Sequence, residues 1–300
     1  MAVDGDPAKN SSPWERLRSW VGPWLPFTGR GIAAFGGATA GRLLMFQALF
    51  SALVSLSLVW GVRQIVLPVV ENALAHLPEA SAGIQGSRLR WPDRDAVVLA
   101  SSPQLAVSVN PDSSPELGLN GDVQIELRDS ELAIRGVLGS YAALYPPGVN
   151  LPLDRIAAGA EWGAWRAPML ALLGLASFFV QLAFFWIVPF VYTVPAWILG
   201  WILHRSIALS TAYRVAAASL WSAALLPAAA IPLYTLLWIR IPGLALMGLA
   251  QFAVGWMGLI WGIASLPPRP AENSRAPNPF AGSTGPRAGT RNKTRNPFHS

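Results

Sequence analysis

Long uncharged apolar runs divide the chain into lipid-compatible and water-compatible segments. Residues 43–62 carry no charge, and the run predicts a helix over 43–67, since about 20 apolar residues cross a bilayer core. Residues 215–238 and 243–266 form two further runs of similar length. The pattern predicts an α-helical polytopic membrane protein with about four transmembrane helices.

One apolar run is too long for a single crossing. Residues 168–203 are uncharged over 36 positions, and a straight helix of that length measures about 54 Å against a hydrocarbon core of about 30 Å. Pro189 and Pro195 offer breaks. Either residues 168–188 cross and 190–203 form an interfacial or continuing helix, or both pieces cross. The positive-inside rule favours one crossing, because two would place a basic tail outside.

Alternation with period two marks the polar segment after the first run. Over residues 123–134, apolar positions alternate with polar ones and continue in phase after a turn at Asp129. This predicts an antiparallel hairpin with one buried apolar face, opposite the side that carries Gln124 and Glu126. Further candidate strands are residues 88–91, 96–100 and 105–109. The segment predicts a small β-rich extracytoplasmic domain between the first and second spans.

The carboxylates are segregated. Twelve of the sixteen lie between Glu71 and Glu161, and none lies from Trp162 to Ala271. Residues 268–300 carry six basic side chains against one acid. Basic ends beside apolar runs are typical of cytoplasmic anchors rather than of nucleic-acid sites. We therefore expect a multi-pass membrane protein with both termini cytoplasmic and no nucleic-acid partner.

The same patterns give an order of segments. It is a cytoplasmic, partly interfacial N-terminal segment (1–42), a first transmembrane helix (43–67), the extracytoplasmic β-rich domain (68–166), a helical membrane domain (167–266, with helices at 168–204, 215–238 and 243–266) and a disordered basic cytoplasmic tail (267–300). Trp14, Trp20 and Trp24 beside arginines indicate the interfacial character of the first segment, for which a flexible tail is the alternative. Ala73-Leu-Ala75 resembles a signal-peptide cleavage site, but the length of the preceding region favours an uncleaved signal anchor.

Residues capable of chemistry are few. The chain has no cysteine, which excludes disulfides and thiolate catalysis. His76, His204 and His299 lie in three different regions without metal-ligand spacing. The glycine-rich segment 36–43 has the outer spacing of a phosphate-binding loop but lacks its lysine and hydroxyl residue. We therefore predict no catalytic, cofactor-binding or metal-binding residue, and no enzymatic activity.

Polar and small residues inside the apolar runs favour helix packing over ligand binding. Gln47, Gln181 and Gln251 are expected to form inter-helix hydrogen bonds. Gly258-x-x-x-Gly262 permits a close helix contact, either within the chain or in a homo-oligomer through the last span. Arg63, Arg214 and Arg240 stand at predicted span ends, where snorkelling to the interface is the simplest role.

Two copies of a tripeptide occur in the tail, Asn278-Pro-Phe280 and Asn296-Pro-Phe298. They resemble the NPF peptides that EH-type domains bind in eukaryotes. Coincidence in a tail rich in Pro and Asn is an equally good explanation.

A wider resemblance covers roughly residues 43–266. The segments 83–89, 105–110 and 123–134, together with 211–217 followed by Pro227, are similar to those of a family of uncharacterised bacterial membrane proteins linked by genomic context to maltodextrin utilisation. The resemblance implies a location in a bacterial inner membrane, a signal anchor, an outside β-rich domain and C-terminal Yip-type helices. That family has no established activity, so the resemblance implies architecture and not function.

The favoured function is therefore a non-enzymatic integral membrane protein, an accessory, sensing or docking component of a membrane system. Its expected partners are the lipid bilayer and a membrane protein or a second copy of the chain. The alternative is a transporter or channel subunit acting as an oligomer, since helices broken at prolines line sites in such proteins. A lipid-modifying or other intramembrane enzyme is least favoured, because the runs lack carboxylates.

Overall fold

The computed structural model describes residues 26–79, 82–113, 117–137 and 139–269. The predicted interfacial segment with Trp14, Trp20 and Trp24, the tail with its repeated tripeptide, and His299 lie outside the described residues.

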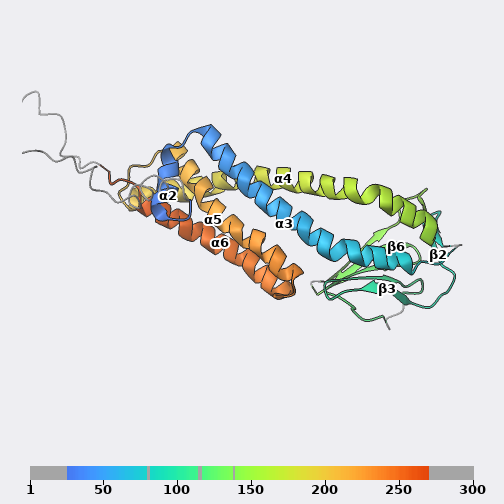
Figure 1. Ribbon diagram of the computed structural model, residues 1–300. Helices are drawn as coiled ribbons and strands as arrows, with labels where there is room; N and C mark the ends of the chain where they lie inside the picture. Colours follow the sequence, from blue (N-terminus) through green and yellow to red (C-terminus); the bar gives the residue numbers. More distant parts are fainter. Residues whose placement is uncertain (1–25, 80–81, 114–116, 138, 270–300) are drawn as a thin grey trace, which may run out of the picture.

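Among the residues that the structure describes, four helices are long and apolar enough to cross a membrane. They are α3 (Ala40–Ala75), α4 (Arg155–Ile202), α5 (Leu209–Thr235) and α6 (Ile241–Ala264). A short helix α2 (Gly29–Ala34) and a 3₁₀ turn η3 (Phe35–Gly37) precede them, and all eight strands lie between α3 and α4 (Figure 1). The elements thus confirm four apolar helices with a small β region between the first and second.

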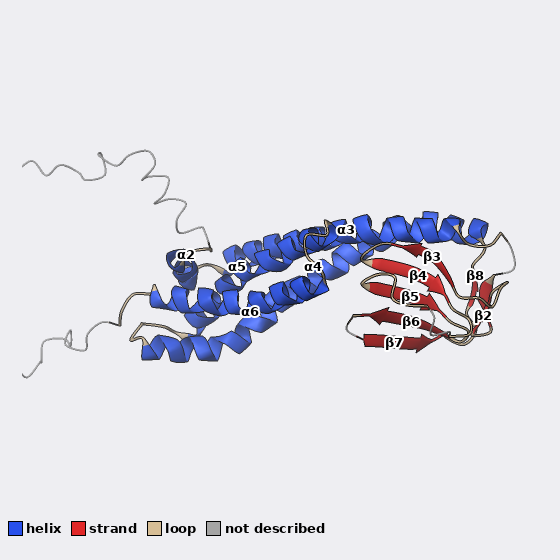
Figure 2. Ribbon diagram, turned by 90° about the horizontal axis from the view of Figure 1, so that it is seen from below, coloured by secondary structure: helices blue, strands red, loops and turns tan. Residues whose placement is uncertain are grey.

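Helices α3 and α4 are longer than the apolar runs that predict them. They have 36 and 48 residues, or about 54 and 72 Å, and both extend past the ends of α5 and α6 to hold the strands (Figures 1 and 2). The apolar run indicates the lipid-compatible part of a helix, whereas the outer turns continue because Val69 and Ala73 pack on the sheet. We call the end of the bundle beside the strands the domain end, and the opposite end, where α2, the start of α5 and the end of α6 meet, the tail end.

The prolines do not break the helices. Helix α4 runs through Pro189 and Pro195, and α5 runs through Pro227 and Pro232. Of the two arrangements considered for residues 168–203, only a continuing helix fits, since no turn separates two pieces.

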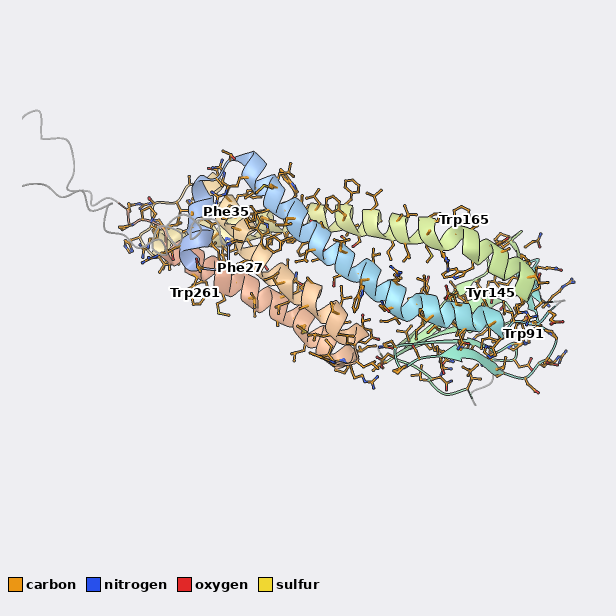
Figure 3. The ribbon with its side chains drawn as sticks, in the orientation of Figure 1. Phe27, Phe35, Trp91, Tyr145, Trp165 and Trp261 are labelled. Carbon is orange, nitrogen blue, oxygen red and sulfur yellow. The ribbon has the colours of Figure 1, made fainter. Side chains whose placement is uncertain are left out.

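The bundle core is aromatic near the tail end. Trp221 of α5 is fully buried and lies against Phe35, Phe46 and Phe50, with ring centroids 4.7, 5.1 and 6.3 Å away. Figure 3 shows Phe35 in this region and Tyr145 at the far domain end, beside the sheet. The two residues belong to two separate apolar cores, one for the bundle and one for the β region.

The strands form two sheets. The order is β3-β4-β5-β6-β7 in the larger sheet and β2-β1-β8 in the smaller one. Their bounds are β1 Gly83–Gln85, β2 Arg88–Arg90, β3 Val97–Ser101, β4 Leu105–Val109, β5 Val123–Leu127, β6 Glu131–Gly136, β7 Gly139–Leu144 and β8 Asn150–Pro152. The predicted hairpin is β5–β6, antiparallel with Leu127 opposite Leu132. Strands β4 and β5 pair in parallel, which requires a crossover connection over residues 110–122.

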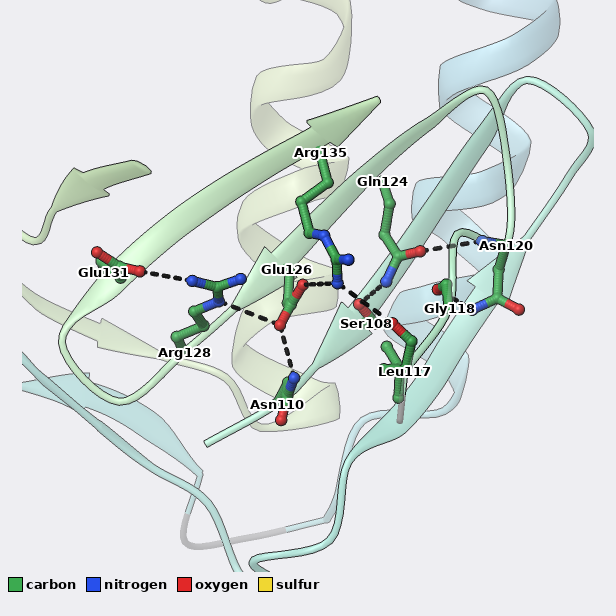
Figure 4. Close-up of polar contacts among 10 residues, drawn as sticks. All are labelled: Ser108, Asn110, Leu117, Gly118, Asn120, Gln124, Glu126, Arg128, Glu131 and Arg135. Carbon is green, nitrogen blue, oxygen red and sulfur yellow. Dashed lines mark hydrogen bonds and ion pairs between the residues drawn. The ribbon is translucent and has the colours of Figure 1, made fainter. Parts of the chain in front are cut away.

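That crossover changes which side of β5 is buried. Gln124 and Glu126 are fully buried, whereas Val123, Ile125 and Leu127 are only half-buried. The apolar side faces α3, as the alternation predicts, but the crossover loop covers the polar side (Figure 4). The expectation of a single buried face is therefore wrong, because the alternation does not reveal the parallel pairing.

Candidate functional site

The buried carboxylate Glu126 is at the centre of the polar side of the sheet. It accepts hydrogen bonds from Asn110 Nδ2 at 2.7 Å, Arg128 Nε at 3.1 Å and Arg135 Nη1 at 3.2 Å (Figure 4). Burial raises the pKa of Glu126, but hydrogen bonds from Arg128, Asn110 and Arg135 outweigh that effect, so the pKa lies below its ordinary value. Glu126 is thus an ionised, well-partnered carboxylate suited to structure rather than to proton transfer.

The neighbouring polar groups attach the crossover loop to the sheet. Gln124 Nε2 donates to Ser108 Oγ at 2.9 Å, and Gln124 Oε1 accepts from the Asn120 backbone at 3.0 Å. Arg135 Nη1 also donates to the Leu117 carbonyl at 3.2 Å. A buried polar network that is satisfied in this way holds Leu117 and Asn120 in one arrangement against the sheet.

The sheet meets the helix bundle at a polar junction. Gln104 Nε2 donates to the carbonyls of Tyr234 and Thr235 at the end of α5, both at 3.3 Å. Tyr234 Oη donates to Asp122 Oδ2 at 3.1 Å. The last carbonyls of a helix lack intrahelical donors, so Gln104 caps α5 and at the same time fastens the start of β4 to it.

An apolar cavity of about 320 Å³ lies directly beneath this junction. Its wall is formed by α3, the last turns of α5, the first turns of α6 and the ends of β4 and β5. The lining residues are Leu58, Gly61, Val62, Ile65, Val66, Gln104, Leu105, Val123, Ile231, Tyr234, Thr235 and Leu244. Such a wall accommodates a hydrocarbon chain and offers no charged group for catalysis.

The two edges of the larger sheet differ. Strand β3 lies against α3, and its residues Leu99 and Ala100 are buried there. Within the described residues, no strand pairs with the outer side of β7, whose residues include Tyr141 and Leu144, 68% and 75% exposed. Proteins usually protect such an edge with charge or proline, yet β7 contains neither. We call β7 the open edge, and it is the candidate docking surface.

The structure separates the histidines. His76 Nδ1 lies 2.8 Å from the Asn72 carbonyl near the domain end. His204 occupies a turn after α4 with φ of +53°, where its carbonyl accepts from Arg269 N at 2.9 Å. Among the described residues, no three His, Asp or Glu side chains form a group that could hold a metal ion.

The glycine-rich segment 36–43 forms a turn and a helix start. Thr39 caps α3 by accepting from the Arg42 backbone at 3.3 Å. Gly36 packs on Thr211 of α5, where a Cβ would lie 2.9 Å from the Thr211 methyl group. The segment therefore serves packing, in line with its rejection as a phosphate loop.

The spacing Gly258-x-x-x-Gly262 is used within the chain. A Cβ on Gly262 would lie 2.5 Å from Ile32 of α2 and 3.1 Å from Val215 of α5, and Gly258 faces Ile32 and Ser219. The close contact that the spacing permits thus joins α6 to α2 and α5. A homo-oligomer through the last span stays a prediction, and it would need another face of α6.

The remaining sequence candidates lie apart from one another. Gln47 is buried between α3 and α4, whereas Gln181 and Gln251 are half-buried at other levels. Arg63 and Arg240 are exposed near the domain end. The junction residues carry no signal in the sequence, since an isolated glutamine and tyrosine fit many roles.

The chain matches no family model, no curated protein and no solved structure.

Proposed function

We propose that this chain is a non-enzymatic polytopic membrane protein whose β domain docks a membrane-protein partner through the open edge. In this proposal all four long helices cross a bacterial inner membrane. The domain end lies outside and the tail end in the cytoplasm.

The distribution of charge supports this orientation. All described carboxylates lie between Glu71 and Glu161, at the domain end. The described arginines of the tail end are Arg30, Arg42, Arg205, Arg214 and Arg269. Arg42 and Arg63 are 21 residues apart on α3, about 31 Å of helix, which matches the hydrocarbon thickness.

The open edge carries the docking proposal. An exposed edge strand offers backbone N–H and C=O groups to an extended segment of another protein, and alternate side chains supply specificity. The β domain is held on two helices that are joined beyond the bundle by Glu71–Arg166 and Glu79–Arg155 ion pairs of 3.0 and 2.9 Å. The edge is therefore presented at a fixed height above the bundle, which suits a partner anchored in the same membrane.

Site-specific photo-crosslinking in native membranes tests the proposal. A photoreactive amino acid at Ala142 of β7 should give a discrete adduct, and the same group at the exposed Leu119 of the crossover loop should not. The double variant Tyr141→Lys/Leu144→Lys should abolish the Ala142 adduct, because charges protect an edge. The matched variant Leu119→Lys should leave it intact. Equal adducts at both positions, or an adduct that survives the double variant, overturn the docking role.

The alternative of a transporter subunit loses its main support. It depended on helices broken at Pro189, Pro195, Pro227 and Pro232, and all four residues lie inside continuous helices. The charge-free helix interiors likewise supply no carboxylate for ion coupling.

A further inference from the structure

A second cavity, of about 470 Å³, lies near the tail end between α3, α4 and α5. Its walls combine apolar and hydroxyl side chains with a single arginine. The lining residues are Ala40, Leu43, Trp186, Phe190, Thr193, Leu209, Ser210, Tyr213 and Arg214. This site is separate from the open edge, which lies at the opposite end of the molecule, where Figure 2 labels β7.

Arg214 has unused binding capacity. A guanidinium carries five N–H donors, and within the described part of the chain Arg214 makes one long hydrogen bond, from Nη1 to the Gly36 carbonyl at 3.4 Å. It forms no ion pair with a described residue, because residues 26–70 and 162–269 contain no carboxylate. Its remaining N–H donors are therefore available to an anion that is not part of the described chain.

The depth of the site indicates where that anion comes from. Arg214 lies 21 residues before Thr235 on α5, about 31 Å along the helix. If Thr235 marks one hydrocarbon boundary, Arg214 stands at the other, level with lipid phosphates. Trp186 and Phe190 of α4 are 42% and 64% exposed beside the cavity, so they border the space where an acyl chain runs.

We propose that this cavity binds one anionic phospholipid of the leaflet at the tail end. The phosphate accepts hydrogen bonds from Arg214 and from the Ser210 hydroxyl, and one acyl chain lies along Trp186 and Phe190. Basic pockets between membrane helices recognise anionic headgroups in this manner. The proposal requires that the helices cross the bilayer, but it is independent of partner docking at β7.

Lipid titration of the full-length protein, followed by native mass spectrometry in detergent, tests the site. Phosphatidylglycerol should bind about tenfold more tightly than phosphatidylcholine, and Arg214→Gln should remove that preference, since charge-assisted hydrogen bonds give the anion its advantage. Arg214→Lys should keep part of it. Arg269→Gln, an exposed arginine of the same end, is the matched control and should bind as the unchanged protein does.

Two further experiments distinguish a lipid headgroup from free phosphate and locate the bound acyl chain. Inorganic phosphate alone should not compete with phosphatidylglycerol, because the apolar wall contributes to binding. A photoactivatable phosphatidylglycerol should label the α4 peptide that contains Trp186 and Phe190. The proposal is overturned if Arg214→Gln and Arg269→Gln reduce binding equally, if phosphate alone competes, or if labelling falls elsewhere. Thermal unfolding of each variant checks that the fold is intact.

Discussion

Gln47 of α3 donates a hydrogen bond from Nε2 to the carbonyl of Phe185 in α4, at 3.0 Å. Phe185 is the residue four positions before Pro189, so its carbonyl is the one that Pro189, lacking an N–H, leaves without a helical donor. The glutamine therefore replaces, from a neighbouring helix, the backbone bond that the proline removes. This accounts for the burial of the Gln47 Nε2 group in an otherwise apolar region.

The same relationship occurs a second time. Ser57 Oγ of α3 donates to the carbonyl of Ala228 in α5 at 2.8 Å, and Ala228 stands four residues before Pro232. Helix α3 thus supplies donors to two proline-containing helices on either side of it. Prolines are tolerated in apolar helices where neighbouring side chains satisfy the freed carbonyl groups.

The first prediction concerns the pairing of Gln47 with Pro189. Gln47→Leu leaves the Phe185 carbonyl without a donor and should lower the free energy of unfolding by about 1 kcal/mol. Pro189→Ala restores a backbone N–H at that position, so the cost of Gln47→Leu should shrink to near zero in its presence. Thermal or denaturant unfolding in detergent over the four-member cycle measures the coupling. Equal costs in both backgrounds would contradict the relationship.

These contacts are features of the structure that the sequence pattern does not predict. The apolar runs predict four helices, and the alternation over residues 123–134 predicts the β5–β6 hairpin, because both patterns reflect local periodicity. The match between Gln47 and Pro189 depends on the relative register of α3 and α4, which brings Gln47 to Phe185, 138 residues away in sequence. The burial of Glu126 depends on a parallel strand pair that no local pattern encodes, and the junction at Gln104 depends on where α5 ends.

The second prediction concerns acid sensitivity of the β domain. The folded pKa of Glu126 is lowered, so its stabilisation is present above the ordinary carboxyl pKa and is lost as the pH falls through the lower folded value. Glu126→Gln should therefore destabilise the domain at neutral pH, by about 1–3 kcal/mol, and have less effect in acid. Hydrogen exchange of β5 and β6 amides between pH 7 and pH 3, corrected for intrinsic rates, measures this. The exposed Asp93→Asn is the control.

The third prediction concerns the stability of the β domain at alkaline pH. Burial is the main cause that raises the pKa of Tyr145 to about 12, and Asp129 and Glu131 add to it against the hydrogen bond to the Arg128 carbonyl. Because the folded pKa is raised, the stabilisation is complete below the ordinary tyrosine pKa of about 10 and is lost as the pH rises towards 12. Tyr145→Phe removes a 3.0 Å hydrogen bond and should cost about 1 kcal/mol at pH 8.

The stabilities of Tyr145→Phe and of the unchanged protein should therefore converge between pH 10 and 12. Thermal unfolding of the full chain in detergent measures both. The exposed Tyr141→Phe should follow the unchanged protein throughout. A constant difference between Tyr145→Phe and the unchanged protein up to pH 12 would show that Tyr145 does not ionise at the cost of folding.

The last prediction separates the junction from the rest of the domain. Gln104→Ala removes both hydrogen bonds to the end of α5, and Tyr234→Phe removes the bond to Asp122. Each should cost about 1 kcal/mol, and the loss should be local, because Val69 and Ala73 of α3 still pack on the sheet. Hydrogen exchange should rise at the start of β4 and at the end of α5 but not in β6, and Gln85→Ala in the exposed part of β1 should change neither. Were exchange to rise across the whole sheet instead, the junction would be part of the folding core of the domain rather than the contact that fastens it to the bundle.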